Sequence, residues 1–122
     1  MPGGGFVVYF TARDGKGRLS IGAATAASPT GPFRDIGQPL ARDTEGRGKD
    51  VGMFLDSHYF YDADSGIGFL IWKRGTVTPP AETHTLLYIQ ALDAAGTELV
   101  GPRSVILKND LSSWEKGVVE AG

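Results

Sequence analysis

The feature that most constrains this chain is a weak internal repeat built from short apolar segments. Val7-Val8-Tyr9-Phe10-Thr11 aligns with Phe69-Leu70-Ile71-Trp72-Lys73, and Ser20-Ile21-Gly22-Ala23 aligns with Tyr88-Ile89-Gln90-Ala91. The offset between the copies is 62 residues for the first pair and 68 residues for the second. A repeat of this length, made of about four short strands, is typical of a blade in a β-propeller.

The apolar segments have the lengths and the borders of β-strands. They span residues 6–10, 19–24, 33–36, 55–61, 68–72, 86–92, 104–107 and 117–120. Turn-forming sequences separate them, and the chain contains 18 Gly and 7 Pro among 122 residues. No window of a dozen residues has a helical period, so we expect no helix longer than a turn or two. The predicted fold class is all-β, an incomplete β-propeller with antiparallel four-stranded blades.

The repeat also predicts where each blade lies. Residues 1–41 form a partial first blade, 51–110 a second blade, and 114–122 the first strand of a third. The polar stretch between Arg42 and Asp50 is an exposed loop between blades. In the second unit a strand precedes the segment that begins at Gly68, whereas in the first unit only residues 1–5 precede Phe6. We therefore expect the first blade to lack its innermost strand and the chain to start and stop within blades.

The composition excludes several classes of partner and site. The net charge is −2, with 12 basic and 14 acidic residues and no basic run, so nucleic acid is not expected as a partner. No apolar stretch reaches the roughly 20 residues that span a bilayer. The lack of cysteine excludes disulfides and thiolate metal sites. Residues 1–5 do not resemble a signal peptide, so secreted and cytoplasmic locations both stay open.

Two carboxylates occupy matching places in the repeat. Asp56 begins the first strand of the second unit, and Glu120 lies on the first strand of the third. The first strand of each propeller blade lines the central channel, so these side chains are expected to converge there. Convergent carboxylates suit glycoside hydrolysis, in which one protonates the leaving oxygen and another activates water. The alternative is that both are solvated carboxylates at strand ends. Glu120 directly follows the apolar residues Val118 and Val119, however, which is unusual for a solvated glutamate.

Three longer motifs resemble one enzyme family. The segments 56–62 with 66–73 and 114–121 resemble the second-blade and third-blade signatures of glycoside hydrolase family 43. The segment 21–33 is similar to the end of that family's first blade. The resemblance covers nearly the whole chain, in the family's order and spacing. It implies a five-bladed propeller that cleaves arabinose or xylose linkages with inversion.

The resemblance also implies roles for individual residues. Glu120 takes the place of the general acid, and Asp56 that of the aspartate that orients the acid and raises its pKa. The family's general base is an aspartate on the first strand of the first blade, which is expected to lie outside this chain. Ser57 stands where many members have proline. A structural calcium would belong to a longer parent protein, and we predict no cofactor and no metal ligand set in this chain.

Other residues are weaker candidates. Trp114, in a loop before the last strand, is either a platform for a sugar ring or an exposed loop side chain. His58 is a candidate for substrate binding, although a hydrogen-bonded structural histidine explains it more simply. The sequence from Asp62 to Gly66 resembles half of a calcium loop and is better explained as a hairpin turn. Trp72 lies in a continuous apolar strand and is predicted to be in the core.

These observations predict a fragment of an inverting glycoside hydrolase. Its partner would be an oligosaccharide or polysaccharide of the arabinan, xylan or arabinoxylan type, and the chain alone would be inactive without the base. One alternative is a carbohydrate-binding or degenerate propeller fragment without catalysis. A second is a propeller hydrolase that acts on fructose or mannose linkages. Exposed blade edges also predict self-association.

Overall fold

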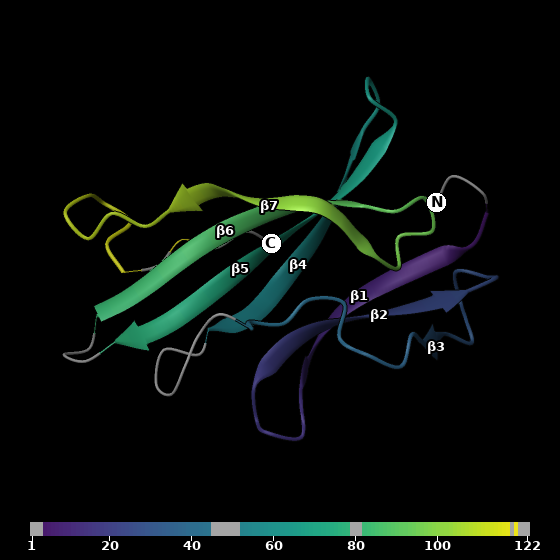
Figure 1. Cartoon of the computed structure of the whole chain (residues 1–122), viewed down its shortest axis with the longest axis horizontal. Helices are drawn as coiled ribbons and strands as arrows, with labels where there is room; N and C mark the ends of the chain where they lie inside the picture. The colour runs from purple at the N-terminus through teal and green to yellow at the C-terminus, as the bar shows by residue number, and fades with distance from the viewer. Residues whose placement is uncertain (1–3, 45–51, 79–81, 118, 120–122) are drawn as a thin grey trace.

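The computed structural model describes the chain except for residues 1–3, 45–51, 79–81, 118 and 120–122. Within the described part there are seven β-strands and no helix (Figure 1). The strands are β1 (Phe6–Arg13), β2 (Leu19–Ala26), β3 (Arg34–Asp35), β4 (Met53–Asp62), β5 (Ile67–Thr78), β6 (Glu82–Leu92) and β7 (Leu99–Lys108). The all-β prediction is confirmed. No helix long and apolar enough to cross a membrane occurs among the described residues.

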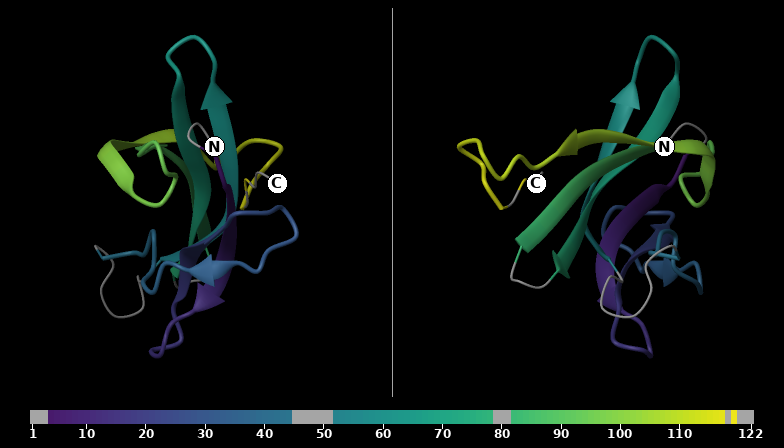
Figure 2. Two further views of the ribbon diagram at one scale, coloured as in Figure 1. Left: turned by 90° about the vertical axis from the view of Figure 1, so that its right-hand side faces the viewer. Right: turned by 60° about the vertical axis from the view of Figure 1, so that its left-hand side comes forward.

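The strands form two separate antiparallel sheets. The first has the order β1-β2-β3, and the second has the order β4-β5-β6-β7. Within each sheet, every strand pairs with the next strand in the sequence, which is the connectivity of a propeller blade. β1 and β2 pack beside β4, so the first sheet lies against the start of the second (Figures 1 and 2). The described part of the first sheet has three strands, with β1 at its edge.

The core lies between the two sheets. Ile21 and Ala41 come from the first sheet and its exit, and Phe54, Leu70, Trp72, Tyr88 and Leu92 come from the second. The rings of Phe54, Trp72 and Tyr88 contact one another with centroids 5.7–6.0 Å apart. These side chains share a face because they alternate along neighbouring strands. Trp72 is 1% exposed, which confirms its predicted place in the core.

An aromatic contact near the sheet edges also joins the two sheets. Tyr9 of β1 stacks on Tyr59 of β4, with ring centroids 6.4 Å apart. The Tyr9 hydroxyl donates a hydrogen bond of 2.8 Å to the carbonyl of Gly96, in the turn between β6 and β7. Burial raises the pKa of Tyr9 to about 12, and the nearby Tyr59 adds to the shift. Tyr9 thus ties the first sheet to β4 and to the turn between β6 and β7.

A buried ion pair fixes the entry into β4. The Asp43 carboxylate accepts hydrogen bonds from the Arg74 guanidinium at 2.9 and 3.1 Å and from the Gly52 amide at 2.5 Å. The side chain of Asp43 is 2% exposed. A Cβ on Gly52 would lie 2.5 Å from Arg74 Nε and 2.6 Å from Asp43 Oδ2, so no larger residue fits without breaking this contact. The connection between the two sheets is therefore held in place where the chain enters β4.

Every strand except β3 is longer than the sequence predicts, and the extensions of β5 and β6 pair with each other. β5 continues from Trp72 to Thr78, and β6 begins at Glu82 rather than Leu86, so His84 lies in a strand and not in a loop. The extension is mostly polar, so an apolar-run criterion misses it even though Lys73 and Thr85 within it are buried. At the C-terminus Gly117 is in a turn and Val119 has no regular structure. Residues 118 and 120 lie outside the described residues, so the predicted strand 117–120 and the blade boundaries stay predictions.

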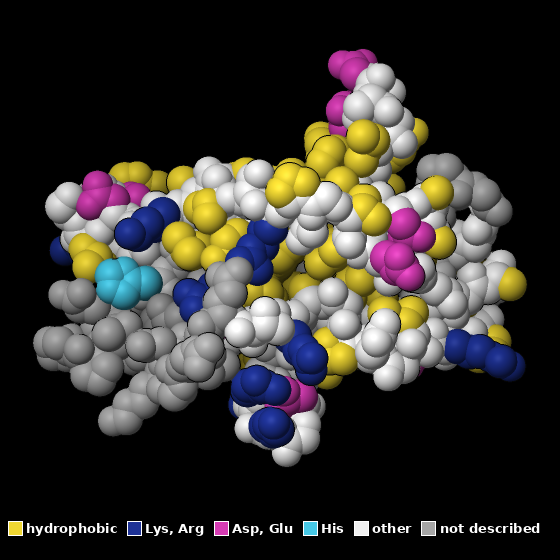
Figure 3. Space-filling view, viewed as in Figure 1, with side chains coloured by type: hydrophobic (Ala, Val, Ile, Leu, Met, Phe, Trp, Pro, Cys, Tyr) yellow, Lys and Arg dark blue, Asp and Glu magenta, His cyan; other side chains and the backbone are white. Residues whose placement is uncertain are grey.

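Large apolar side chains are exposed on the second sheet. Val105, Ile106 and Leu107 of β7 are 54%, 48% and 47% exposed, and Phe60 of β4 is 49% exposed. The space-filling view shows hydrophobic side chains at the surface over β6 and β7 (Figure 3). These side chains form part of the surface that β4 and β7, the outer strands of the second sheet, present to solvent.

Candidate functional site

Asp56 lies at a break in the regular pairing of β4. Leu55 is opposite Lys73 and His58 is opposite Ile71, so Asp56 and Ser57 together oppose the single residue between them on β5. This is a β-bulge, which re-aims side chains and is frequent beside active sites. Asp56 has a φ of 53°, in the left-handed region that favours glycine. A non-glycine residue there costs about 1–2 kcal/mol, and such strain clusters at functional positions.

The Asp56 carboxylate forms an ion pair with Lys73 of the neighbouring strand. The distance between Lys73 Nζ and Asp56 Oδ2 is 2.7 Å. The Lys73 side chain is 8% exposed, whereas that of Asp56 is 41% exposed. A buried ammonium therefore lies beneath a carboxylate that a ligand can reach. Lysine in a strand is expected to be solvated, and for this reason the sequence did not identify Lys73.

Glu120, the predicted general acid, lies outside the described residues. Its distance from Asp56 and the expected place of its strand beside β4 stay predictions. The described segment before it, however, has defined contacts with β6. The Thr85 hydroxyl donates to the carbonyl of Gly117 at 3.2 Å, and the Val119 amide donates to the same hydroxyl at 3.3 Å. The chain is therefore held as far as Val119.

A buried polar cluster around Thr85 anchors this segment. Asn109 Oδ1 accepts from the Thr85 amide at 2.9 Å, and Asn109 Nδ2 donates to the carbonyl of Lys116 at 2.8 Å. Thr85 is 1% exposed and Asn109 is 5% exposed. Thr85 pairs with Gly75, and Gly75 pairs with Met53 at the start of β4. The described segment that leads to position 120 therefore contacts the end of the second sheet that also carries Asp56.

Trp114 projects from the loop that precedes this docked segment. Its side chain is 93% exposed, the highest value among the large exposed hydrophobic residues. The surrounding turn is held by its own polar groups, including a hydrogen bond from Ser113 Oγ to the Glu115 carboxylate. That bond lowers the pKa of Glu115, which marks Glu115 as a turn-stabilising carboxylate. Such a flat, solvated indole has the surface that stacks on sugar rings.

His58 lies two residues beyond Asp56 on the same strand. It is exposed, and it points away from the face on which Tyr59 packs against the first sheet. The described residues contain no group of three or more His, Cys, Asp and Glu side chains that could hold a metal. The turn from Asp62 to Gly66 is a hairpin turn, in which Ser65 Oγ donates to the Asp62 carboxylate at 2.6 Å and lowers its pKa.

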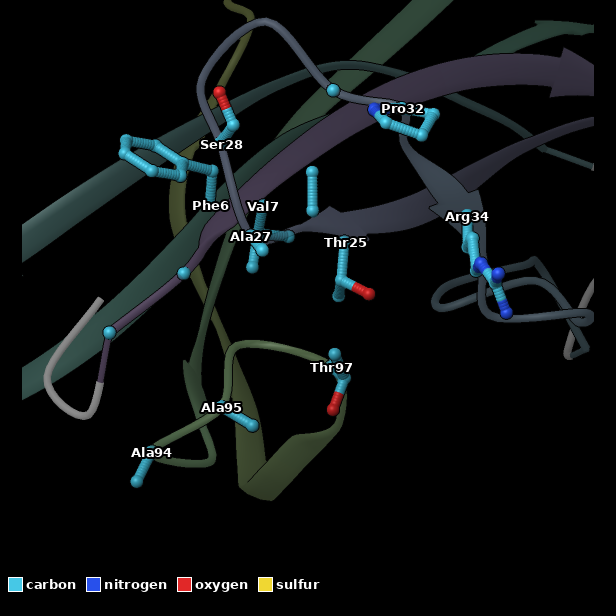
Figure 4. Close-up of a pocket in the computed structure, with 14 residues that line it drawn as sticks. Phe6, Val7, Thr25, Ala27, Ser28, Pro32, Arg34, Ala94, Ala95 and Thr97 are labelled. Carbon is cyan, nitrogen blue, oxygen red and sulfur yellow. The ribbon is translucent and has the colours of Figure 1, made fainter.

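A cavity of about 730 Å³ lies between the two sheets, remote from Asp56 (Figure 4). It opens beside the turn that contains Ala94 and Ala95, at the opposite end of the second sheet from Met53. Its polar side chains are Thr25, Ser28, Arg34 and Thr97. Among the described residues no carboxylate lines it, and neither does Asp56, His58 or Trp114.

Known proteins place the chain in a family. The model of glycosyl hydrolases family 43 matches residues 2–122. The crystal structure of a thermostable family-43 glycoside hydrolase is similar, with a TM-score of 0.70 and 26% sequence identity. The similarity covers 93% of this chain and 35% of that one, so the chain spans about a third of its relative's length. No curated protein matches the sequence. The predicted resemblance is therefore confirmed, and the chain belongs to glycoside hydrolase family 43.

Proposed function

We propose that this chain is the part of an inverting glycoside hydrolase that carries the general acid and the aspartate that tunes it. Glu120 would protonate the glycosidic oxygen, and Asp56 would orient Glu120 and keep it protonated by placing a like charge nearby. The observation that carries the proposal is Asp56 itself. It is a reachable carboxylate in a strained bulge on the strand next to the first sheet, and the docked segment before Glu120 reaches the same end of the second sheet.

The catalytic base is proposed to lie outside this chain. Inversion requires a second carboxylate roughly 6.5–9.5 Å from the acid, to leave room for the attacking water. In the family this base is on the first strand of the first blade, and that strand would pair with the edge that β1 presents. Asp56 is a poor substitute, because it would lie on the acid's side of the sugar. The 122-residue chain alone should then show no turnover.

The proposed substrates are glycans that contain arabinose or xylose, such as arabinan, xylan or arabinoxylan. Membership of the family supports a carbohydrate substrate, and the motifs around Asp56 and Trp114 resemble those of members acting on these sugars. Trp114 is proposed to stack on a sugar ring, and His58 to contact the substrate at the edge of the site. A non-catalytic carbohydrate-binding protein is the remaining alternative.

The experiment compares leaving groups in the full-length protein that contains this segment. Glu120→Gln should nearly abolish hydrolysis of natural glycans, a loss of roughly 10²–10⁴-fold that matches the contribution of general acid catalysis. Hydrolysis of aryl glycosides should slow much less, because their leaving groups need little protonation. Asp56→Asn should move the alkaline limb of the pH–rate profile to lower pH, because the acid would lose its proton more easily.

Two results would contradict the proposal. Equal losses on both substrate types would remove Glu120 from the role of acid. Sugar binding by the full-length protein without turnover of any arabinoside or xyloside would favour the binding-protein alternative. Asp64→Asn, in the exposed hairpin turn, is the matched control for loss of a carboxylate and should leave both rates unchanged.

A further inference from the structure

Two adjacent cations of β5 have different partners on opposite faces of the sheet. Arg74 pairs with the buried Asp43 on the side of the first sheet. Lys73 faces the other way and pairs with Asp56 at 2.7 Å. Successive side chains of a strand alternate in direction, so neither cation can replace the other. Arg74 holds the entry of β4, whereas Lys73 contacts the candidate site.

The position of Lys73 is coupled to the bulge. Lys73 is the cross-strand neighbour of Leu55, the last regularly paired residue before Asp56. On its other side it neighbours Leu87, which is 6% exposed. Its stem thus runs between two leucines, and its ammonium emerges where the bulge turns Asp56 toward it. A regular strand would place the side chain of residue 56 on the opposite face from that of residue 55 and from Lys73, so the bulge makes the contact possible.

Burial of the ammonium requires a compensating charge. Moving a lysine ammonium out of water is unfavourable unless a carboxylate and hydrogen bonds replace the water. An ion pair between two solvated side chains would have little energetic significance, but here one partner is 8% exposed. The strained conformation of Asp56 also has to be stabilised by its surroundings. The pair meets both requirements.

We propose that Lys73 is a positioning residue. Its buried ammonium holds the charged Asp56 carboxylate in one orientation at the bulge. This inference rests on the proposed function, in which Asp56 acts on Glu120. Lys73 would not contact the reacting atoms, and it would act through Asp56. Loss of Lys73 should therefore impair the same step as loss of Asp56.

The test uses a double-mutant cycle in the full-length protein, with Lys73→Met, Asp56→Asn and the double variant. Lys73→Met should lower kcat on a natural glycan by about tenfold or more, and kcat on an aryl glycoside by about threefold or less, as expected for a group that assists the acid. The double variant should be within about threefold of Asp56→Asn alone, because residues that act as a unit are not additive. Lys73→Arg, which keeps the charge, should restore part of the rate. Lys16→Met, an exposed lysine in the turn between β1 and β2, is the matched control.

Equal losses on both substrates, or losses that multiply in the double variant, would show that Lys73 has only a structural role. If Lys73→Met does not fold, Lys73→Arg takes its place, and an arginine variant that loses more rate on the natural glycan than on the aryl glycoside would support the proposal. An arginine variant that loses equally on both substrates would overturn it.

A second measurement does not depend on activity. The Lys73 side-chain ammonium should give a nitrogen–proton NMR correlation in the wild-type protein, because a buried and paired ammonium exchanges protons slowly with water. Asp56→Asn should broaden or shift this signal, and Lys16→Met should not. An unchanged signal in Asp56→Asn would overturn the inference. One outcome separates the two proposals: Glu120→Gln loses equal rate on natural and aryl glycosides, while Asp56→Asn still changes the Lys73 signal. In that case the proposed function fails and the pairing of Lys73 with Asp56 stands.

Discussion

At the scale of the residue, Asp56 combines backbone strain with an exposed charge. Its φ of 53° suits glycine, yet the residue is an aspartate paired with a buried lysine. Among non-glycine residues, aspartate and asparagine adopt this conformation most readily, since their short polar side chains interact locally with the backbone. The charge and the backbone conformation can therefore be tested separately.

Asp56→Asn and Asp56→Ala should differ in stability. Both remove the charge and leave the Lys73 ammonium without this partner, but only alanine adds the full cost of the left-handed conformation. We expect Asp56→Ala to lower the free energy of unfolding by about 1 kcal/mol more than Asp56→Asn. Urea denaturation of the full-length protein measures the difference. Equal destabilisation would show that the backbone of residue 56 is not strained.

The sequence predicted Asp56 as a site residue but not its geometry or its partner. Its matching place in the repeat and the resemblance to the family together singled out Asp56, and its role in a site stays a prediction. The bulge leaves no mark in composition, and the lysine resembles any solvated strand lysine. A useful signal was available in Trp72-Lys73-Arg74, since two adjacent cations at the end of an apolar strand require partners on both faces.

At the scale of the element, the polar cluster on β6 holds the segment that leads to Glu120. Thr85 and Asn109 are both buried, and their side chains satisfy the backbone groups of Lys116, Gly117 and Val119. Apolar runs predicted strands β1, β2, β5 and β6 because burial selects such residues. This anchor was not predictable, because two isolated polar residues far apart in sequence carry no pattern.

Thr85→Val should release the end of the described chain. Valine has nearly the same shape but offers no hydroxyl to Gly117 or Val119. We expect a loss of about 1–3 kcal/mol in the free energy of unfolding, typical of a buried polar group left without its partner. Amide hydrogen exchange at residues 116–119 should become faster, and Thr11→Val, on the exposed part of β1, should have no effect. Unchanged exchange would mean that other contacts hold the segment.

The contact between Tyr9 and the second sheet predicts a loss of stability at high pH. The pKa of Tyr9 is raised to about 12 in the folded protein, above the ordinary value of 10.0. The folded state therefore keeps this proton more tightly, and its contribution to stability is complete below pH 10 and falls as the pH rises toward 12. Because Tyr9 is only partly buried, we expect the effect to be about 1 kcal/mol.

Tyr9→Phe should remove this part of the pH dependence. Denaturation curves at pH 8 and pH 11 measure the difference between the variant and the wild type. Tyr61→Phe, on the exposed part of β4, is the control. A Tyr9→Phe variant that loses as much stability as the wild type between the two pH values would show that the proton on Tyr9 is not coupled to folding.

At the scale of the whole molecule, the two sheets share one core but leave other faces exposed. The aromatic contacts lie on the face of the second sheet that meets the first, whereas Phe60, Val105 and Leu107 are in contact with solvent. The chain also covers only 35% of the related structure, in which further chain is available for packing. The architecture was predictable from the repeat, whereas the extent of the exposed surface required the structure.

The 122-residue chain should therefore associate with itself when it is produced alone. We expect oligomers or aggregates in sedimentation velocity, because the apolar side chains of β7 and its place at the edge of the described sheet favour contact with other copies. Val105→Lys with Leu107→Glu should reduce association, since charges on an edge strand oppose pairing. A monodisperse wild-type chain with a sharp melt would contradict this expectation.

The bulge at Asp56 also constrains how this strand can change in evolution. Phe54 and Tyr59 both pack toward the first sheet, although their positions differ by five, an odd spacing that would put them on opposite faces of a regular strand. Only the extra residue in the bulge reconciles that spacing with the alternation of a strand. Deletion of one codon between Leu55 and His58 would turn His58 and Phe60 inward and Tyr59 outward. Insertions and deletions should therefore be tolerated in the hairpin after Asp62 and eliminated at the bulge, so that the length of the segment from Phe54 to Tyr59 is inherited as a unit.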